Sequence, residues 1–110
     1  MQEPTASSMR RQFERRALRA NAFIHCRGRY QRAKVVDYSQ DGLQLQGTFG
    51  LMKRDPILIE LLSGTRVQGR VAWTLGAHTG VAFTEVLPES HPALAELARK
   101  ANARSTLQVS

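Results

Sequence analysis

The chain has 110 residues, of which 42% are hydrophobic, and a formal net charge of +7. This length suits one domain with its own hydrophobic core and is too short for two. No run approaches the roughly 18 apolar residues of a membrane span, and no apolar export signal stands near the start, so we expect a cytoplasmic protein. The single cysteine, Cys26, excludes an intrachain disulfide, which agrees with a reducing compartment.

The positive charge is concentrated in the first third of the chain. Residues 1–34 contain nine Lys or Arg against two acidic residues, whereas residues 35–110 contain seven of each sign. Eight of the nine are Arg, whose planar guanidinium group binds phosphate through two parallel hydrogen bonds and stacks on purines. This distribution indicates an anion site near the N-terminus. A solvated basic arm without a dedicated ligand is the alternative.

The first half of the chain predicts disorder, then a basic arm, then a hairpin. Residues 1–9 are polar and small, which predicts disorder, and the Arg-rich arm follows over residues 10–16. From there the apolar residues alternate, which predicts strands over 17–26 and 30–36. The residues of the first strand that should face the core are Leu18, Ala20, Ala22, Ile24 and Cys26. Cys26 is therefore expected to be a small core residue and not a nucleophile.

Turn residues divide the rest of the apolar pattern into four more strands. They are predicted over residues 43–46, 57–62, 66–75 and 79–83. Six short strands predict an all-β fold, a small six-stranded antiparallel β-barrel. Trp73 falls on the apolar side of the fifth strand and is expected in the core. Asp37 to Gly42 is predicted to be a turn in which Gly42 can take positive φ.

The hydrophobic period changes from two to helical after Pro88. Leu94, Leu97, Ala98 and Ala101 recur at helical spacing, and Ser90 is a suitable N-cap. The pattern predicts one C-terminal α-helix over residues 88–102 and a flexible tail over 103–110. The barrel domain with its arm then occupies residues 10–87.

Two short motifs flank the first hairpin. RQFER at residues 11–15 has the form R-x-x-x-R, and DYSQDG at residues 37–42 has the form D-x-S-x-x-G. In this order and spacing the two motifs resemble those of the PilZ domain, a bacterial module that binds cyclic di-GMP. The resemblance covers roughly residues 9–87. Arg15 to Arg19 gives a second R-x-x-x-R match, but Arg19 already belongs to the first strand, so the match that begins at residue 11 is preferred.

The resemblance implies a non-catalytic receptor without a cofactor. The ligand-binding residues that it implies are Arg10, Arg11, Arg15, Asp37, Ser39 and Gly42. The arginines would bind phosphates or guanine O6 and N7, Asp37 would accept hydrogen bonds from guanine N1 and N2, and Gly42 would let the backbone approach the ligand. Asp37 and Ser39 could instead only cap the turn.

Several consequences of this interpretation are left open by the sequence. The pattern does not decide whether Tyr38, Arg16 or Arg29 touches the ligand, or how many dinucleotides bind. We expect binding to order the arm and to signal to a partner protein. His25, His78 and His91 lie far apart without metal-ligand spacing, so no zinc site is expected.

The main alternative is a small basic barrel that binds single-stranded nucleic acid. The chain has seven aromatic residues, and no strand shows a cluster of exposed aromatics on which bases could stack, so nucleic acid is not expected as a partner. An enzyme is disfavoured because the chain has no G-x-S-x-G motif and no P-loop. A PilZ-like adaptor that has lost its ligand is disfavoured because both motifs are intact.

Overall fold

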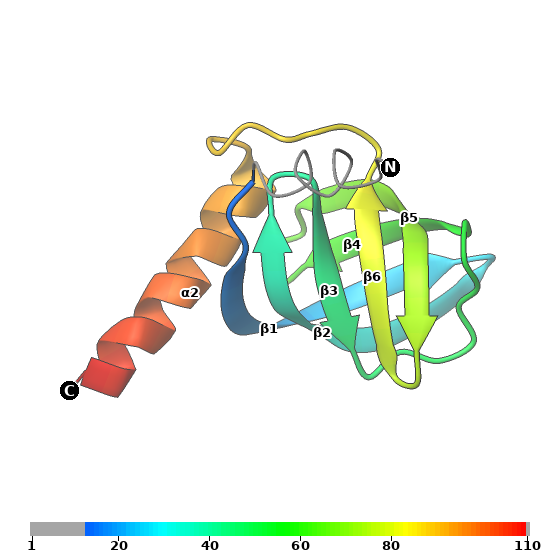
Figure 1. Ribbon diagram of the computed structural model, residues 1–110, viewed down its shortest axis with the longest axis horizontal. Coiled ribbons are helices and arrows are strands. Elements are labelled where there is room, and N and C mark those ends of the chain that lie inside the picture. The colour runs from blue at the N-terminus through cyan, green and yellow to red at the C-terminus, as the bar shows by residue number, and fades with distance from the viewer. Residues whose placement is uncertain (1–12, 110) are drawn as a thin grey trace, which may run out of the picture.

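The computed structural model describes residues 13–109, with side chains described as far as residue 103 (Figure 1). Six antiparallel strands close into a barrel in the order β1-β2-β3-β6-β5-β4, which confirms the predicted fold. The elements are β1 (Arg16–Cys26), β2 (Arg29–Ser39), β3 (Gly42–Gln46), β4 (Pro56–Leu61), β5 (Arg66–Leu75), β6 (His78–Phe83) and the helix α2 (Pro92–Val109). Closure leaves no unpaired sheet edge.

The barrel interior is filled by the inward-facing residues of its strands. The side chains that are at most 2% exposed include Leu18, Ile24, Val35, Leu43, Leu45, Ile59 and Val71. Cys26 is buried as predicted, and burial, together with the neighbouring carboxylate of Asp55, raises the pKa of its thiol. The core therefore lies inside the barrel, and ligand contacts must come from outward positions, loops or the segment before β1.

A β-bulge in β2 changes the facing of the D-x-S-x-x-G motif. The register shifts between Val35 and Asp37, after which Tyr38 pairs with Leu43 and faces the core. An extra residue in a strand reverses the alternation that follows it, so Asp37 faces outward. The strand also continues to Ser39, so the motif occupies a strand end and the turn after it. The predicted end at residue 36 is wrong because the bulge breaks the alternation on which the prediction rests.

A second bulge lies in β5. The register shifts between Val71 and Trp73, and Trp73 pairs with Gly80 on the outer face with 41% of its surface exposed. The backbone of Val71 is held by the β3–β4 loop: Arg54 N–H donates to the Val71 carbonyl (2.7 Å), and Val71 N–H donates to the Asp55 carbonyl (2.9 Å). The prediction that Trp73 belongs to the core is wrong because this bulge turns it outward.

Gly42 is required for a different reason from the one predicted. It lies at the start of β3 without positive φ. A Cβ at this position would lie 2.2 Å from the carbonyl oxygen of Val81 on β6, closer than real atoms approach. The close packing of β3 on β6 therefore excludes any side chain here, and Gly42 does not use the positive φ that a glycine allows.

The helix α2 packs against β1 through buried Leu94, Leu97 and Ala101. Its first turn is capped by His91, whose ring Nδ1 accepts a hydrogen bond from Ala93 N–H at 3.1 Å, and not by the predicted Ser90. The helix continues past the predicted end at residue 102 and extends beyond the barrel (Figure 1). No helix in the described part of the chain is both long and apolar enough to cross a membrane.

Candidate functional site

The two motifs meet through the side chain of Arg15. One terminal nitrogen of its guanidinium group forms an ion pair with Asp37, and the other lies 3.5 Å from the hydroxyl of Ser39. The side chains of Arg15 and Asp37 remain 51% and 25% exposed. Exposed pairs of this kind contribute only about 0–1 kcal/mol, so Arg15 is positioned by Asp37 but remains available to a ligand.

Ser39 organises the turn that carries the motif. Its side chain is 1% exposed, and its hydroxyl donates to the Asp41 carboxylate and accepts from Asp41 N–H at 3.4 Å. The Asp41 carbonyl in turn accepts from Phe83 N–H at 2.9 Å. Ser39 therefore acts as a positioning residue that fixes Arg15 and the turn.

A hollow of about 550 Å³ lies beside Arg15 on the outer face of β3, β6 and β5. Four small residues form part of its lining, which we call its floor: Gly42, Ala72, Gly80 and Ala82. Gln44, Glu14 and Asp41 also line the hollow. Arg15 and Trp73 stand at its borders. Because glycine and alanine carry little or no side chain, a planar ring could approach the backbone closely where the floor is not covered by a neighbour.

Trp73 lies directly across Gly80. A Cβ at Gly80 would be 2.2 Å from the indole Nε1 and 2.4 Å from Cε2 of Trp73. Gly80 therefore makes room for the indole, and the bulge in β5 holds the indole at the edge of the hollow. Neither Trp73 nor Gly80 was predicted from the sequence to belong to the site. The sequence shows only that Trp73 and Gly80 fall on consecutive strands. That they face each other follows only from the register of β5 and β6.

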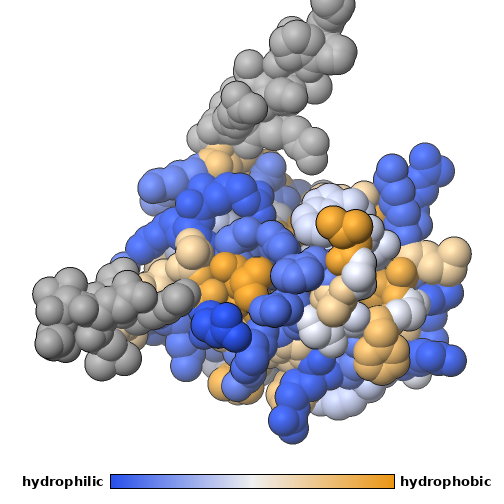
Figure 2. Space-filling model, turned by 60° about the horizontal axis from the view of Figure 1, so that its bottom comes forward, coloured by the Kyte–Doolittle hydropathy of each residue, from blue (hydrophilic) through white to orange (hydrophobic). Residues whose placement is uncertain are grey.

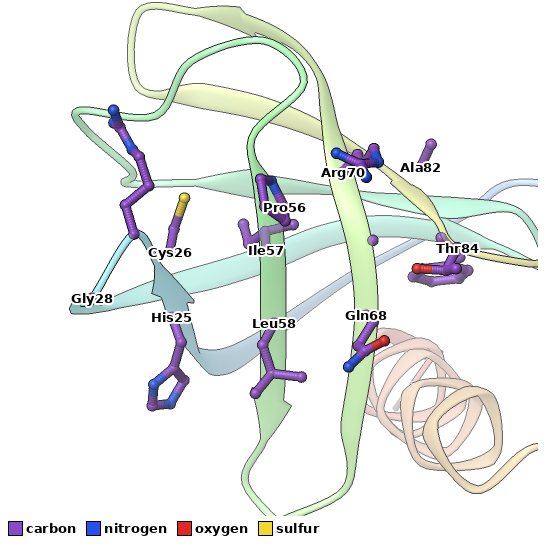
Figure 3. A pocket seen from close by; sticks show the side chains of 13 residues that line it. His25, Cys26, Gly28, Pro56, Ile57, Leu58, Gln68, Arg70, Ala82 and Thr84 are labelled. Carbon is purple, nitrogen blue, oxygen red and sulfur yellow. The ribbon is translucent and has the colours of Figure 1, made fainter.

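A larger hollow of about 610 Å³ crosses the outer face from the end of β1 over β4 and β5 (Figure 3). Its two arginines already have partners within the protein. Arg27 pairs with Asp55 at 3.3 Å, and Arg70 donates to the carbonyl of Arg54 at 3.1 Å. Apart from these two arginines and His25, the residues that line this hollow are uncharged, among them Pro56 and Leu58 (Figure 3). Since neither motif reaches it, we assign the site to the hollow beside Trp73.

The structure brings four of the six predicted ligand residues together and places the three residues that the sequence left undecided. Arg15, Asp37, Ser39 and Gly42 gather at one end of β2 and β3, whereas Arg10 and Arg11 lie outside the described residues. Among the three undecided residues, Tyr38 faces the core, Arg29 lies at the opposite end of β2, and Arg16 donates to Asn102 Oδ1 of α2 at 2.7 Å. Within residues 13–109, no three His, Cys, Asp or Glu side chains gather in a way that could hold a metal ion.

The fold and the candidate site are those of a small β-barrel module with a hollow on its outer face. Residues 9–100 match the family model of the PilZ domain, and the chain belongs to this family. Membership implies a receptor for cyclic di-GMP, and PilZ domains are generally without catalytic activity. No curated protein matches the chain significantly.

Proposed function

We propose that this chain binds cyclic di-GMP in the hollow beside Trp73 and passes the binding event to a partner protein. The observation that carries the proposal is that Arg15, which lines that hollow, contacts Asp37 and Ser39, which lie outside its lining. Two motifs that are separated by a hairpin in the sequence thus form one site.

The chemistry of Arg15 and Asp37 matches the two kinds of group that the dinucleotide carries. Cyclic di-GMP has two phosphodiesters and two guanines. A guanidinium group binds a phosphate, or guanine O6 and N7, through two hydrogen bonds. A carboxylate accepts from guanine N1–H and N2–H, a pair of donors that adenine lacks. The site should therefore discriminate between guanine and adenine.

The hollow offers a surface for a base as well as charge for a phosphate. The floor consists of glycine and alanine, which carry little or no side chain, and the indole of Trp73 lies over Gly80. Stacking of a base on an aromatic ring stabilises a complex by about 1–3 kcal/mol. We infer that one guanine lies on this floor against Trp73.

The arginine arm supplies the remaining charge. Residues 10–16 contain four arginines and one acid, Glu14, so the arm repels itself until an anion is bound. The two phosphodiester charges of the ligand would draw Arg10 and Arg11 toward the hollow. Ordering costs about 1–2 kcal/mol for each fixed residue, which predicts moderate affinity and a reversible signal. Amide hydrogen exchange of residues 9–14 should slow when cyclic di-GMP is added.

Arg16 connects the segment that carries Arg15 with the helix α2. It is adjacent to Arg15 in sequence and donates to Asn102 on α2. Movement of the arm on ligand binding would therefore alter the anchoring of α2, which extends beyond the barrel. A partner protein that contacts α2 could detect this change.

Titration calorimetry tests the proposal. Cyclic di-GMP should bind, cyclic di-AMP should bind more weakly, and Arg15→Ala should reduce the affinity for cyclic di-GMP. Arg66→Ala is the matched control, because Arg66 is an exposed arginine at the start of β5, away from the hollow. Equal affinity for the two dinucleotides, or equal loss in both variants, would contradict the proposal.

A further inference from the structure

A cluster of aromatic side chains covers the outer face of the β1–β2 hairpin. The rings of Phe23 and Tyr30 are stacked with centroids 5.5 Å apart and planes 6° apart. His25 meets Tyr30 edge-on at 4.4 Å, and the guanidinium carbon of Arg32 lies 6.0 Å from the centroid of Phe23. Tyr30 remains 59% exposed. Nucleic acid was not expected from the sequence because no strand showed a cluster of exposed aromatic residues. The structure forms such an aromatic cluster (Phe23, His25, Tyr30) across two strands.

A basic hollow of about 320 Å³ adjoins the aromatic cluster. It is lined by Arg19, Arg32 and Lys34 with the side-chain amides of Asn21 and Gln46, and by no acidic residue. The ion pairs found in the described part of the chain involve other cations. Three cations close together without a carboxylate favour the binding of an anion.

Arg32 belongs to both features. It lines the basic hollow and also lies over Phe23, so a phosphate-binding surface and an aromatic surface are continuous. On the other side of the hairpin Glu60 of β4 pairs with Phe23 in the register and forms an ion pair with His25. A polyanion would therefore approach from the side of β2 and β3. The hollow beside Trp73, which we call the nucleotide hollow, is a separate surface, because it lies over β3, β6 and β5.

We propose that the outer face of the β1–β2 hairpin is a second binding site, for single-stranded nucleic acid. Its backbone phosphates bind at Arg19, Arg32 and Lys34, and a base stacks on the exposed ring of Tyr30. Positively charged sheet surfaces with aromatic side chains bind single strands in this way. An acidic protein segment would use the same cations but would leave the aromatic cluster without a partner. This inference does not depend on the proposed cyclic di-GMP site.

Fluorescence anisotropy of the full chain with a labelled oligouridylate of about 12 nucleotides tests the proposal. An oligoglutamate peptide of similar length is the competing occupant. The oligonucleotide should bind, and with about three phosphates contacted the slope of log K against log salt should be about −2. Absence of oligonucleotide binding, or equal binding of the glutamate peptide, would overturn the proposal.

Four variants locate the site. Tyr30→Ala should weaken oligonucleotide binding by about 10-fold, whereas Tyr30→Phe should retain it. The double variant Arg32→Gln, Lys34→Gln should lower the salt slope by about one unit or more. Lys53→Gln, on the β3–β4 loop, is the control for loss of charge and should have a smaller effect. Thermal unfolding of each variant verifies the fold. Oligonucleotide binding that none of the hairpin variants changes would place it elsewhere and refute the inference.

Discussion

The two outer faces of the barrel differ in what their strands carry outward. The face over β3, β6 and β5 has a floor of glycine and alanine, with Trp73 at its border and the Arg15–Asp37 ion pair beside it. The hairpin face over β1 and β2 carries stacked aromatic rings and three cations, and its hollow has no acidic lining. The first face suits a small planar ligand with donors and acceptors to recognise. The second suits an extended anion.

The difference originates in backbone register. The face over β3, β6 and β5, which we call the nucleotide face, depends on bulges in β2 and β5 that turn Asp37 and Trp73 outward. The central part of the hairpin, from Asn21 to Cys26 on β1, pairs without a bulge. The surrounding surface also carries isolated apolar side chains such as Phe49, Met52 and Leu75, and Figure 2 shows apolar patches bordered by hydrophilic residues on one face. The hairpin face also has a register shift, between Ala17 and Ala20 of β1, but its aromatic rings lie in the regularly paired part.

Filling the floor of the nucleotide hollow should have the largest effect. Gly42→Val places a side chain against the Val81 carbonyl, where a Cβ alone would lie 2.2 Å from the oxygen. We expect the free energy of unfolding to fall by about 1–3 kcal/mol or more, with loss of cyclic di-GMP binding. Urea unfolding measures the stability. Gln46→Val, at the other end of β3, is the control, and an equal loss there would refute the close-approach argument.

A structural feature of this barrel could be predicted from the sequence when it is determined by residues that are close together in the chain. Alternation alone predicted the six strands, because each strand buries one face, and it placed Leu18 and Ile24 in the core correctly. A bulge adds one ordinary residue and leaves no compositional mark, so the facing of Asp37 and Trp73 was not accessible from alternation. The family resemblance named Asp37 without explaining how it faces outward.

The hairpin cluster was missed for a related reason. Phe23 was only an exception to the alternation of one strand, and Tyr30 stood alone near a turn. The register that opposes His25 to Tyr30 and Phe23 to Arg32 brings the rings together. Contacts between strands depend on this register, and the hydrophobic pattern of a single strand does not contain it.

Removing a single guanidinium group should affect cyclic di-GMP binding on one face and not on the other. A charge-assisted hydrogen bond contributes about 1.5–3 kcal/mol, so Arg15→Ala should weaken cyclic di-GMP binding by about 10- to 100-fold, and Arg11→Ala is expected to do the same. Arg32→Ala removes the same charge from the hairpin and should leave cyclic di-GMP binding nearly unchanged. Isothermal titration compares the three.

Arg15→Ala should also have little effect on folding, because its ion pair with Asp37 is exposed. Its thermal unfolding temperature should therefore stay close to that of the parent. A large decrease would show that Arg15 is structural, and the loss of binding could then not be assigned to a ligand contact.

Removing an aromatic ring should have a smaller effect on cyclic di-GMP binding, and the effect should depend on which face loses the ring. Trp73→Ala should weaken cyclic di-GMP binding by about 10-fold if a guanine stacks on the indole, whereas Tyr30→Ala should not. Fluorescence competition with a labelled cyclic di-GMP measures both. If the two variants weaken cyclic di-GMP binding equally, the two faces do not act as separate sites.

Salt should have the smallest effect on the nucleotide site. Cyclic di-GMP carries two charges, so its affinity should change only modestly between about 50 and 200 mM salt, and less steeply than oligonucleotide affinity. Calorimetry at these two concentrations provides the comparison. A steeper decrease for cyclic di-GMP than for the oligonucleotide would contradict the assignment of ligands to faces.

The central claim, that cyclic di-GMP binds beside Trp73 and not on the hairpin, is tested most directly by ¹H–¹⁵N NMR titration of the labelled protein. The account predicts large shifts for the indole N–H of Trp73 and the amides of Gly42 and Gly80, with little change at Tyr30 and Arg32. Shifts centred on the hairpin, or no shift at Trp73 and Gly80 under saturating ligand, would contradict it.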